Sequence, residues 1–150
     1  DIMQHYPYTF DNTRVHNWIL KNQERYEIFG FGLWAVVLKG SGKMIGDCGV
    51  TMQNINGSIK PEIGYHIAKK YQHQGYAKEA SQKVRDWIFE NTPFNIIYSY
   101  MKKSNIASSA TARSNGMCYV DEFNDSENEI TVVYAITRNE WNNLKTSVNF

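Results

Sequence analysis

A glycine-containing loop near the middle of the chain has the composition of an anion-binding site. The loop reads Gln72-His73-Gln74-Gly75-Tyr76-Ala77, and an amphipathic segment follows it directly. The first N–H groups of a helix have no partner within the helix, and the helix dipole is positive at this end, so phosphate is favoured there. Glycine and a small residue let the backbone approach the anion closely. The pattern indicates a pyrophosphate site without a lysine, but an ordinary strand-to-helix turn has the same composition.

Two titratable side chains just before this loop could exchange protons with a ligand. Side chains alternate between the faces of a strand, so Glu62 and His66 share one face, away from Ile63, Tyr65 and Ile67. Glu62 is the first candidate for a base, and His66 is the alternative because an imidazole titrates near neutral pH. Each residue also has an interpretation without function: Glu62 could be a solvent-facing carboxylate, and His66 could be a polar surface histidine.

The bulk composition is that of one globular domain. The chain has 150 residues, of which 42% are hydrophobic and 21% charged, and this length can bury a substantial core. The net charge is +1, from 16 basic and 15 acidic residues, which gives no reason to expect nucleic acid or an anionic membrane as partner. No segment reaches the roughly 18 apolar residues of a membrane span, and we expect no signal peptide.

Cysteine and histidine spacing excludes several other kinds of site. Cys48 and Cys118 have neither metal-binding nor redox spacing, which favours two free thiols in a reducing, cytoplasmic compartment, with a disulfide between them left open. The four histidines show no metal-ligand spacing, so we expect no metal. The segment Gly30-Phe31-Gly32-Leu33-Trp34-Ala35 fits G-x-G-x-x-A but precedes a strand, so it fails as a dinucleotide fingerprint.

Hydrophobic periodicity and turn residues predict the elements that position these residues. The predicted elements are a helix capped by Asp11 and ended by Gly30, strands over residues 33–38, 44–52 and 59–67, a helix over 75–90, a strand over 94–101, a helix capped by Ser104 or Asn105 and ended by Gly116, strands over 117–123 and 129–137, and a short terminal turn opened by a capping box from Thr137 to Glu140. Pro61 predicts an edge or an unpaired position for its part of the third strand. This order predicts a small α/β (α+β) domain, a mixed sheet with helices on both faces.

Several separated motifs resemble the GNAT superfamily of N-acetyltransferases. Gln72-x-x-Gly75-x-Ala77 resembles the family signature Q/R-x-x-G-x-G/A. The flanking motifs resemble the branch typified by the ribosomal-protein N-terminal acetyltransferases RimJ and RimL; they are Glu62-Ile63-Gly64-Tyr65, Gly75-Tyr76-Ala77-Lys78-Glu79-Ala80, Asn105-Ile106-Ala107-Ser108, and the segment from Tyr134 to Trp141. The resemblance covers about residues 6–141 as one domain, and the family's first strand and much of its first helix would precede Asp1. A polar stretch at residues 109–115 departs from the pattern.

The resemblance implies acetyl-CoA as co-substrate, in a mostly antiparallel sheet whose middle strands splay apart. The pantetheine arm would lie like an added strand against backbone groups near Tyr65, His66 and Ile67, and one N–H there would polarise the thioester. The N–H groups of the loop from Gln72 to Ala77 would hold the pyrophosphate, and Asn105 would hydrogen-bond the arm. Ser108 occupies the position proposed to protonate or hydrogen-bond the leaving sulfur, with a hydroxyl bonded to its own helix as the alternative. Glu62 would be the base, directly or through water.

The implied activity is acetyl transfer to a primary amine, either a protein N-terminus or a small molecule. An α-amine, with a pKa of about 8, needs less help from a base than a lysine amine near 10.4. Tyr6, Tyr8 and Phe10 could line the acceptor site, although packing is their plainer role. A non-catalytic acyl-CoA-binding or regulatory domain and a protein-interaction module are the alternatives, and a homodimer is left open.

Overall fold

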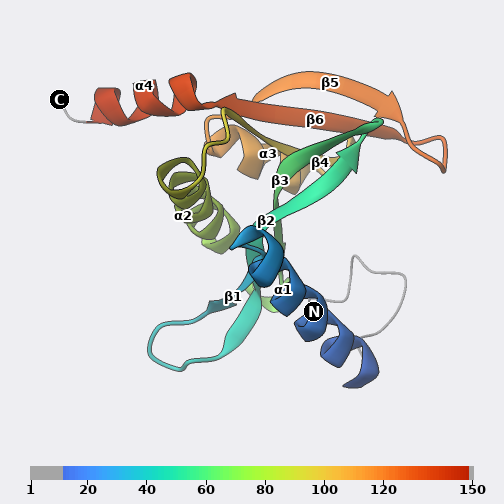
Figure 1. The fold of residues 1–150 in the computed structure, drawn as a ribbon, viewed down its shortest axis with the longest axis vertical. Coiled ribbons are helices and arrows are strands. Elements are labelled where there is room, and N and C mark those ends of the chain that lie inside the picture. Colours follow the sequence, from blue (N-terminus) through green and yellow to red (C-terminus); the bar gives the residue numbers. More distant parts are fainter. Residues whose placement is uncertain (1–11, 149–150) are drawn as a thin grey trace.

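Within the residues that the structure describes, six strands form one mixed sheet in the order β1-β2-β3-β4-β6-β5 (Figure 1). The computed structural model describes the backbone of residues 12–148 and the side chains of residues 16–146. The strands are β1 (Leu33–Val37), β2 (Met44–Ile55), β3 (Ser58–Ile67), β4 (Ile96–Lys102), β5 (Cys118–Asn124) and β6 (Ile130–Thr137). The helices are α1 (Asn12–Phe29), α2 (Tyr76–Asn91), α3 (Ile106–Ser114) and α4 (Arg138–Val148), with a short 3-10 helix at Lys69–Tyr71. Only β3 and β4 pair in parallel, so the expected mixed, mostly antiparallel sheet is confirmed.

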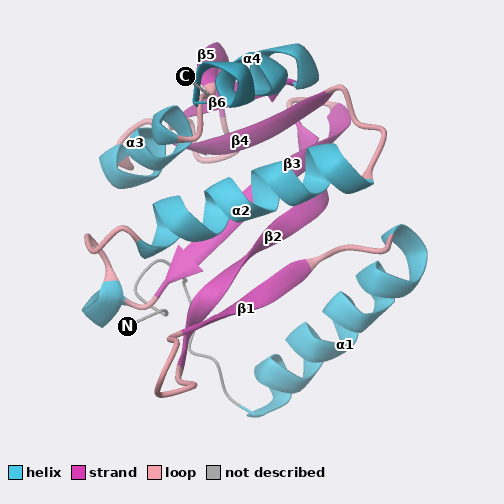
Figure 2. Cartoon of the chain, turned by 90° about the vertical axis from the view of Figure 1, so that its left-hand side faces the viewer, coloured by secondary structure: helices cyan, strands magenta, loops and turns pink. Residues whose placement is uncertain are grey.

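The two faces of the sheet differ in polarity because side chains alternate along each strand. Val50 lies opposite Ile63, and Cys48 lies opposite Tyr65, on the face that α2 covers. Val84 of α2 joins this apolar cluster. Figure 2 shows α2 in front of the sheet, with α3 beside it at the level of β4. The apolar side chains therefore form one core between these helices and the sheet.

Helix α1 runs beside the edge strand β1 (Figure 2). The Asn22 side chain accepts a hydrogen bond from the Leu33 N–H at 2.9 Å, and the Tyr26 hydroxyl donates to the Leu33 carbonyl at 2.7 Å. Arg25 interacts electrostatically with Asp47, which lies on the face that α2 does not cover. Helix α1 thus provides hydrogen-bond partners for the backbone of Leu33 at the start of β1. It also brings the positive charge of Arg25 to the face of the sheet that α2 does not cover, as expected for a sheet with helices on both faces.

Strands β3 and β4 separate after a single point of contact. Their only bridge joins Glu62 to Tyr98, whereas β3 stays paired with β2 as far as Ile67 and β4 with β6 from Ile96 to Lys102. Each strand keeps its antiparallel neighbour, so the two halves of the sheet diverge between them. This divergence is the splay expected of the middle strands, and we call it the β3–β4 opening.

Some local features differ from the sequence prediction. Pro61 lies in an interior strand and not at an edge, so of the two predicted positions the unpaired one fits. Its nitrogen faces β4 next to the single bridge between β3 and β4, where little pairing is lost. The capping box is confirmed, because the Thr137 and Glu140 side chains each bond the other's N–H. It opens an eleven-residue helix, not the predicted short turn. Asp11, Tyr6, Tyr8 and Phe10 lie outside the described residues.

Two further findings concern the whole described region. No helix of residues 12–148 is long and apolar enough to cross a membrane. Both cysteines are free thiols, Cys48 buried in the core and Cys118 exposed on β5.

Arg138 holds the end of α2 together with the segment that leads into β4, and replacing Arg138 tests this role. Its guanidinium donates to the carbonyls of Phe89, Thr92 and Phe94, the last two at 2.7 Å. Because a lysine cannot span three carbonyls, we expect Arg138→Lys to lower the free energy of unfolding by about 1–3 kcal/mol, measured as the urea midpoint at constant slope. Arg113→Lys, at an exposed arginine with one bond to Tyr134, is the control. Equal midpoints for the two variants would contradict this role.

Candidate active site

The loop before α2 presents backbone donors that the protein itself does not use. Gly75 is the N-cap of α2, with φ 87° and ψ 2°, and no side chain caps the helix. The first N–H of the helix with an acceptor belongs to Glu79, which donates to the Gly75 carbonyl at 3.0 Å. Within the described residues, the N–H groups of Gly75, Tyr76, Ala77 and Lys78 have no acceptor. Exposed N–H groups at a helix N-terminus are suited to bind an anion.

The side chains of Gln72 and Gln74 help to hold the shape of the loop. Gln72 Nε2 donates to the Ile67 carbonyl at 2.8 Å, which ties the loop to the end of β3. Gln74 Nε2 donates to the Lys70 carbonyl at 3.2 Å. His73 is exposed with φ 63°, a left-handed conformation that is uncommon outside glycine. The loop is therefore shaped by its own bonds, and its N–H groups at the start of α2 stay open to a ligand.

One wall of the β3–β4 opening is the free side of β3. The Ile63 carbonyl accepts from Ser99 of β4 at 3.0 Å, so by alternation the backbone groups of Tyr65 and Ile67 face the same opening. The Ile67 carbonyl is already bonded to Gln72. The His66 carbonyl faces β2, because a Cβ on Gly46 would collide with it. Of the three expected backbone positions, Tyr65 and Ile67 therefore face the opening and His66 does not.

Glu62 turns its carboxylate into the opening. The residue is only 9% exposed, and its carboxylate accepts from the Tyr100 N–H, with Ser99 of β4 close by. A Cβ on Gly64 would lie 3.3 Å from Glu62 Oε1, with nothing else within 4 Å, so the carboxylate leans over an uncrowded glycine. Burial raises the pKa of the Glu62 carboxyl well above its usual value, and the interactions with Tyr100 and Ser99 lower it by less. The alternative of a solvent-facing carboxylate is wrong.

His66 belongs to a separate pair on the same face of the sheet. Its Nδ1 lies 2.7 Å from Asp47 Oδ1, and Asp47 is 5% exposed. Four residues of strand separate His66 from Glu62, roughly 13 Å at about 3.3 Å per residue. Residues 16–146 contain no group of three His, Cys, Asp or Glu side chains that could hold a metal ion.

Helix α3 brings Ser108 to the other wall of the opening. Asn105 caps the helix, its side chain accepting from the Ser108 N–H at 3.2 Å. The Tyr65 hydroxyl donates to the Ser108 carbonyl at 2.7 Å. Thr111 and Ser114 bond back to carbonyls of their own helix. The structure thus places Ser108 beside the Tyr65 hydroxyl, and a role of the Ser108 hydroxyl toward a leaving sulfur stays a prediction.

Three residues around Glu62 and His66 were not predicted. Asp47 pairs with His66, the Tyr100 N–H bonds the Glu62 carboxylate, and Ser99 lies close to that carboxylate. A signal for Ser99 exists in the sequence, because it stands between Ile97 and Met101 on the buried side of a strand, where an apolar residue is expected. Which carboxylate it meets depends on strand order, which local patterns do not encode.

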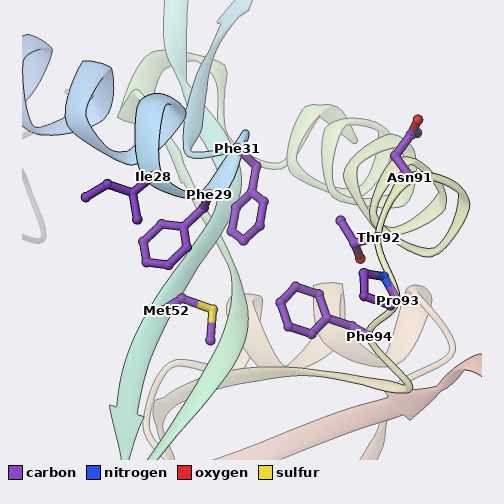
Figure 3. A pocket seen from close by; sticks show the side chains of 8 residues that line it. All are labelled: Ile28, Phe29, Phe31, Met52, Asn91, Thr92, Pro93 and Phe94. Atoms are coloured by element: carbon purple, nitrogen blue, oxygen red, sulfur yellow. The ribbon is translucent and has the colours of Figure 1, made fainter.

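A hollow of about 490 Å³ lies elsewhere, between the end of α1, β2 and the segment after α2 (Figure 3). It is lined by Ile28, Phe29, Phe31, Met52, Asn91, Thr92, Pro93 and Phe94. These side chains include no acid, base or nucleophile placed with the groups above. The hollow is therefore separate from the β3–β4 opening.

The chain belongs to the GNAT acetyltransferase superfamily. Residues 1–118 match the family model described as the acetyltransferase (GNAT) domain. Acetyltransferases of this superfamily share the fold and use acetyl-CoA, which agrees with the N–H groups without acceptors before α2 and with the β3–β4 opening.

Proteins similar to this chain include acetyltransferases and an uncharacterized protein. The uncharacterized protein YkkB of Bacillus subtilis (strain 168) is 31% identical over 119 residues, 79% of this chain and 69% of YkkB. The FsC-acetyl coenzyme A-N(2)-transacetylase of Aspergillus fumigatus is 27% identical over 147 residues, 90% of this chain and 62% of that protein. The solved structure of RimL, ribosomal L7/L12 alpha-N-protein acetyltransferase in complex with coenzyme A, has a TM-score of 0.73 at 18% identity, covering 89% of this chain and 77% of RimL. This last likeness shows the shared fold.

The burial of Glu62 predicts a pH-dependent cost in stability. Because its pKa is raised in the folded chain, the folded state binds the proton more tightly, and stability falls as pH rises from the unfolded pKa, about 4.3, through the folded one. Glu62→Gln cannot ionise, so we expect it to be the more stable form at pH 8, with an advantage that shrinks toward pH 4. Each unit of pKa difference corresponds to about 1.4 kcal/mol.

Urea unfolding of both forms between pH 4 and pH 8 measures this effect. Glu24→Gln removes a negative charge from the exposed surface of α1 and controls for net charge. A Glu62→Gln variant that is less stable than the parent at pH 8 would show that the ionised carboxylate stabilises the fold.

Proposed function

We propose that this chain transfers the acetyl group of acetyl-CoA to a primary amine. The observation that carries the proposal is the row of N–H groups without acceptors at the start of α2, beside an opening between two strands. A diphosphate fits the first feature, and an extended amide-bearing arm fits the second, as an added strand would. The Aspergillus relative is named as a transacetylase that acts with acetyl coenzyme A at an N(2) position, which supports acetyl transfer to a nitrogen.

The residues present fit the co-substrate without a metal or a lysine. The N–H groups of Gln74, Gly75, Tyr76 and Ala77 would hold the pyrophosphate, with Gln72 and His73 shaping the loop. Backbone groups of Tyr65 and the Ile67 N–H would pair with the pantetheine amides. The side-chain oxygen of Asn105 caps α3, so its amide nitrogen would be the group that donates a hydrogen bond to the pantetheine arm.

The reaction needs two proton transfers. The amine nitrogen attacks the thioester carbon and loses a proton, the carbon–sulfur bond breaks, and the thiolate gains a proton. Glu62 is the proposed base, since its carboxylate faces the opening and burial raises its pKa toward that of an amine, which makes it a more effective acceptor. Ser108 is the proposed donor to sulfur. His66 stays the alternative base, held by Asp47 farther along the strand.

The acceptor is proposed to be an α-amine or a small amine, as in the RimJ and RimL branch. The motifs around Glu62 and Asn105 and the shared fold with RimL support this branch. The non-catalytic alternative loses one argument, because the polar stretch before Gly116 has structural partners: Asn115 bonds Ser81, and Arg113 bonds Tyr134.

Release of free thiol from acetyl-CoA tests the proposal. The chain is incubated with acetyl-CoA and an amine panel: a peptide with a free α-amine, an amino acid ester, spermidine and Nα-acetyl-lysine. We expect thiol release and an acetylated amine with at least one of them. Binding of acetyl-CoA without turnover would indicate the regulatory alternative, and absence of binding would indicate a protein-interaction module.

Two glycines with the same backbone conformation give a matched test of the pyrophosphate site. Gly75 has φ 87° and Gly40, in the β1–β2 turn, has φ 88°, and a Cβ on either meets nothing within 4 Å. Alanine at either position should cost about 1–2 kcal/mol of stability through left-handed strain. Only Gly75→Ala places a methyl group where the phosphate approaches, so we expect a Kd for acetyl-CoA raised about tenfold or more, roughly 1.4 kcal/mol, by titration calorimetry. Equal affinity of the two variants would exclude this site.

A further inference from the structure

Three glycines bring the end of helix α1 close to the strand that carries Glu62. Gly64 follows Glu62 by two residues on β3 and lies opposite Gly49 of β2, so all three share the face of the sheet that α2 does not cover. A Cβ on Gly49 would lie 2.0 Å from the carbonyl oxygen of Gly32. The segment that leaves α1 therefore rests directly on β2, one strand away from Gly64.

The side chain of Arg25 starts at this junction between α1 and β2. A Cβ on Gly32 would lie 3.4 Å from Arg25 Cβ and 3.7 Å from Arg25 Cδ, so the arginine stem passes beside this glycine. The hydrogen bond from the Leu33 N–H to Asn22 Oδ1 fixes α1 to the start of β1 at the same place. The origin of the Arg25 side chain is therefore held next to the face that carries Glu62.

The guanidinium of Arg25 has spare hydrogen-bond donors. Its hydrogen bond within the described part of the chain goes from Nη1 to Asn22 Oδ1, at a long 3.4 Å. Among residues 16–146, no carboxylate lies within 4 Å of this guanidinium, and Asp47 acts on it from farther away. A guanidinium presents five N–H groups in a planar fork that matches a carboxylate. The half-buried Arg25 can therefore bind an anionic group of a ligand.

The space between Arg25 and Glu62 has glycine as its floor. Gly64 and Gly49 are one strand spacing apart, about 4.8 Å. Among the described residues, a Cβ on Gly64 would meet only Glu62 Oε1, at 3.3 Å. Glu62 stands on one side of this floor, at the bridge that begins the β3–β4 opening, and Arg25 stands on the other. A ligand lying over Gly64 would thus have a proton acceptor at one end and a fixed positive charge at the other.

We propose that the acceptor amine carries a carboxylate, which Arg25 binds while the amine faces Glu62 and the β3–β4 opening. This inference rests on the proposed acetyl transfer and names its class of acceptor, an amino acid or another amine with an acidic group. Arg25 would be a binding residue that positions the acceptor, and it takes no part in bond making. A polyamine such as spermidine would bring a second positive charge toward Arg25, which is unfavourable.

A purely structural role for Arg25 would be to offset the negative charge of Asp47. Such a role would change the stability of the chain, and its loss would affect every acceptor alike. Binding of a carboxylate, in contrast, concerns only those acceptors that have one. The test must therefore compare acceptors that differ in the carboxylate alone.

Two matched pairs of acceptors provide this comparison: glycine with glycinamide, and Nα-acetyl-lysine with its amide. Thiol release from acetyl-CoA gives kcat/KM per neutral amine, for the pair that reacts faster. We expect the parent to prefer the acid about tenfold or more, as for a hydrogen bond to a charged group. Arg25→Gln should lose this preference through a raised KM for the acid, with a far smaller effect on the amide. Arg25→Lys keeps the charge without the planar fork and should show an intermediate preference.

Lys21→Gln is the matched control, because it removes a positive charge from an exposed position of the same helix. It should keep the parental preference for the acid. The Kd for acetyl-CoA, measured by titration calorimetry, should stay within twofold of the parent in all three variants. If Arg25→Gln fails to fold by circular dichroism, the parental preference and Arg25→Lys decide the question.

Two results would overturn the inference. They are a parent that uses the acid and the amide equally well, and an Arg25→Gln variant that keeps the parental preference. Thiol release would persist in both cases, so the acetyl transfer would stand and the class of acceptor would be wrong. A parent chain that releases no thiol with any amine would instead refute the proposed function.

Discussion

The separation of β3 from β4 after the bridge at Glu62 and Tyr98 is the constraint on which the rest of the site depends. Two parallel strands that stayed paired would consume the backbone groups of Tyr65 and Ile67 and leave no room for a buried carboxylate. Both strands instead keep their outer antiparallel neighbours, so the opening costs the sheet only its weakest ladder. Glu62 partly replaces that ladder, because its carboxylate accepts the Tyr100 N–H across the gap.

The burial of Glu62 that lowers the stability of the fold also favours its proposed role as a proton acceptor. A carboxylate in the opening is poorly solvated and only partly compensated by hydrogen bonds, which disfavours its charged form. A raised pKa makes the carboxylate a stronger proton acceptor, which suits the proposed transfer of a proton from an amine. The fold tolerates the group because the surrounding core is continuous, from Val50 and Ile63 under α2 to Ile136 on β6. The packing around Glu62 thus supports a buried carboxylate that does not itself add to the packing.

Much of the fold was predictable from local pattern, whereas the site was predictable only in part. The helix after Gly75, the strand alternation around Glu62 and the capping box at Thr137 depend on neighbours in sequence and were predicted. The partners Asp47 and Ser99 depend on which strands adjoin. Placing β4 between β3 and β6 is a non-consecutive arrangement, and no periodicity within a single segment encodes it. The resemblance to a family supplied the opening but not the hydrogen bonds across it.

The loop before α2 fixes its own shape through Gln72 and Gln74, while its first helical N–H groups have no acceptor. If these main-chain groups bind the diphosphate as proposed, the exposed side chains of His73 and Gln74 need not contact it. Such a surface could change its charge and shape by substitution while the proposed binding of the cofactor persists. The rim of the proposed cofactor site could in this way adapt to new acceptors without a change in the main chain that would hold acetyl-CoA.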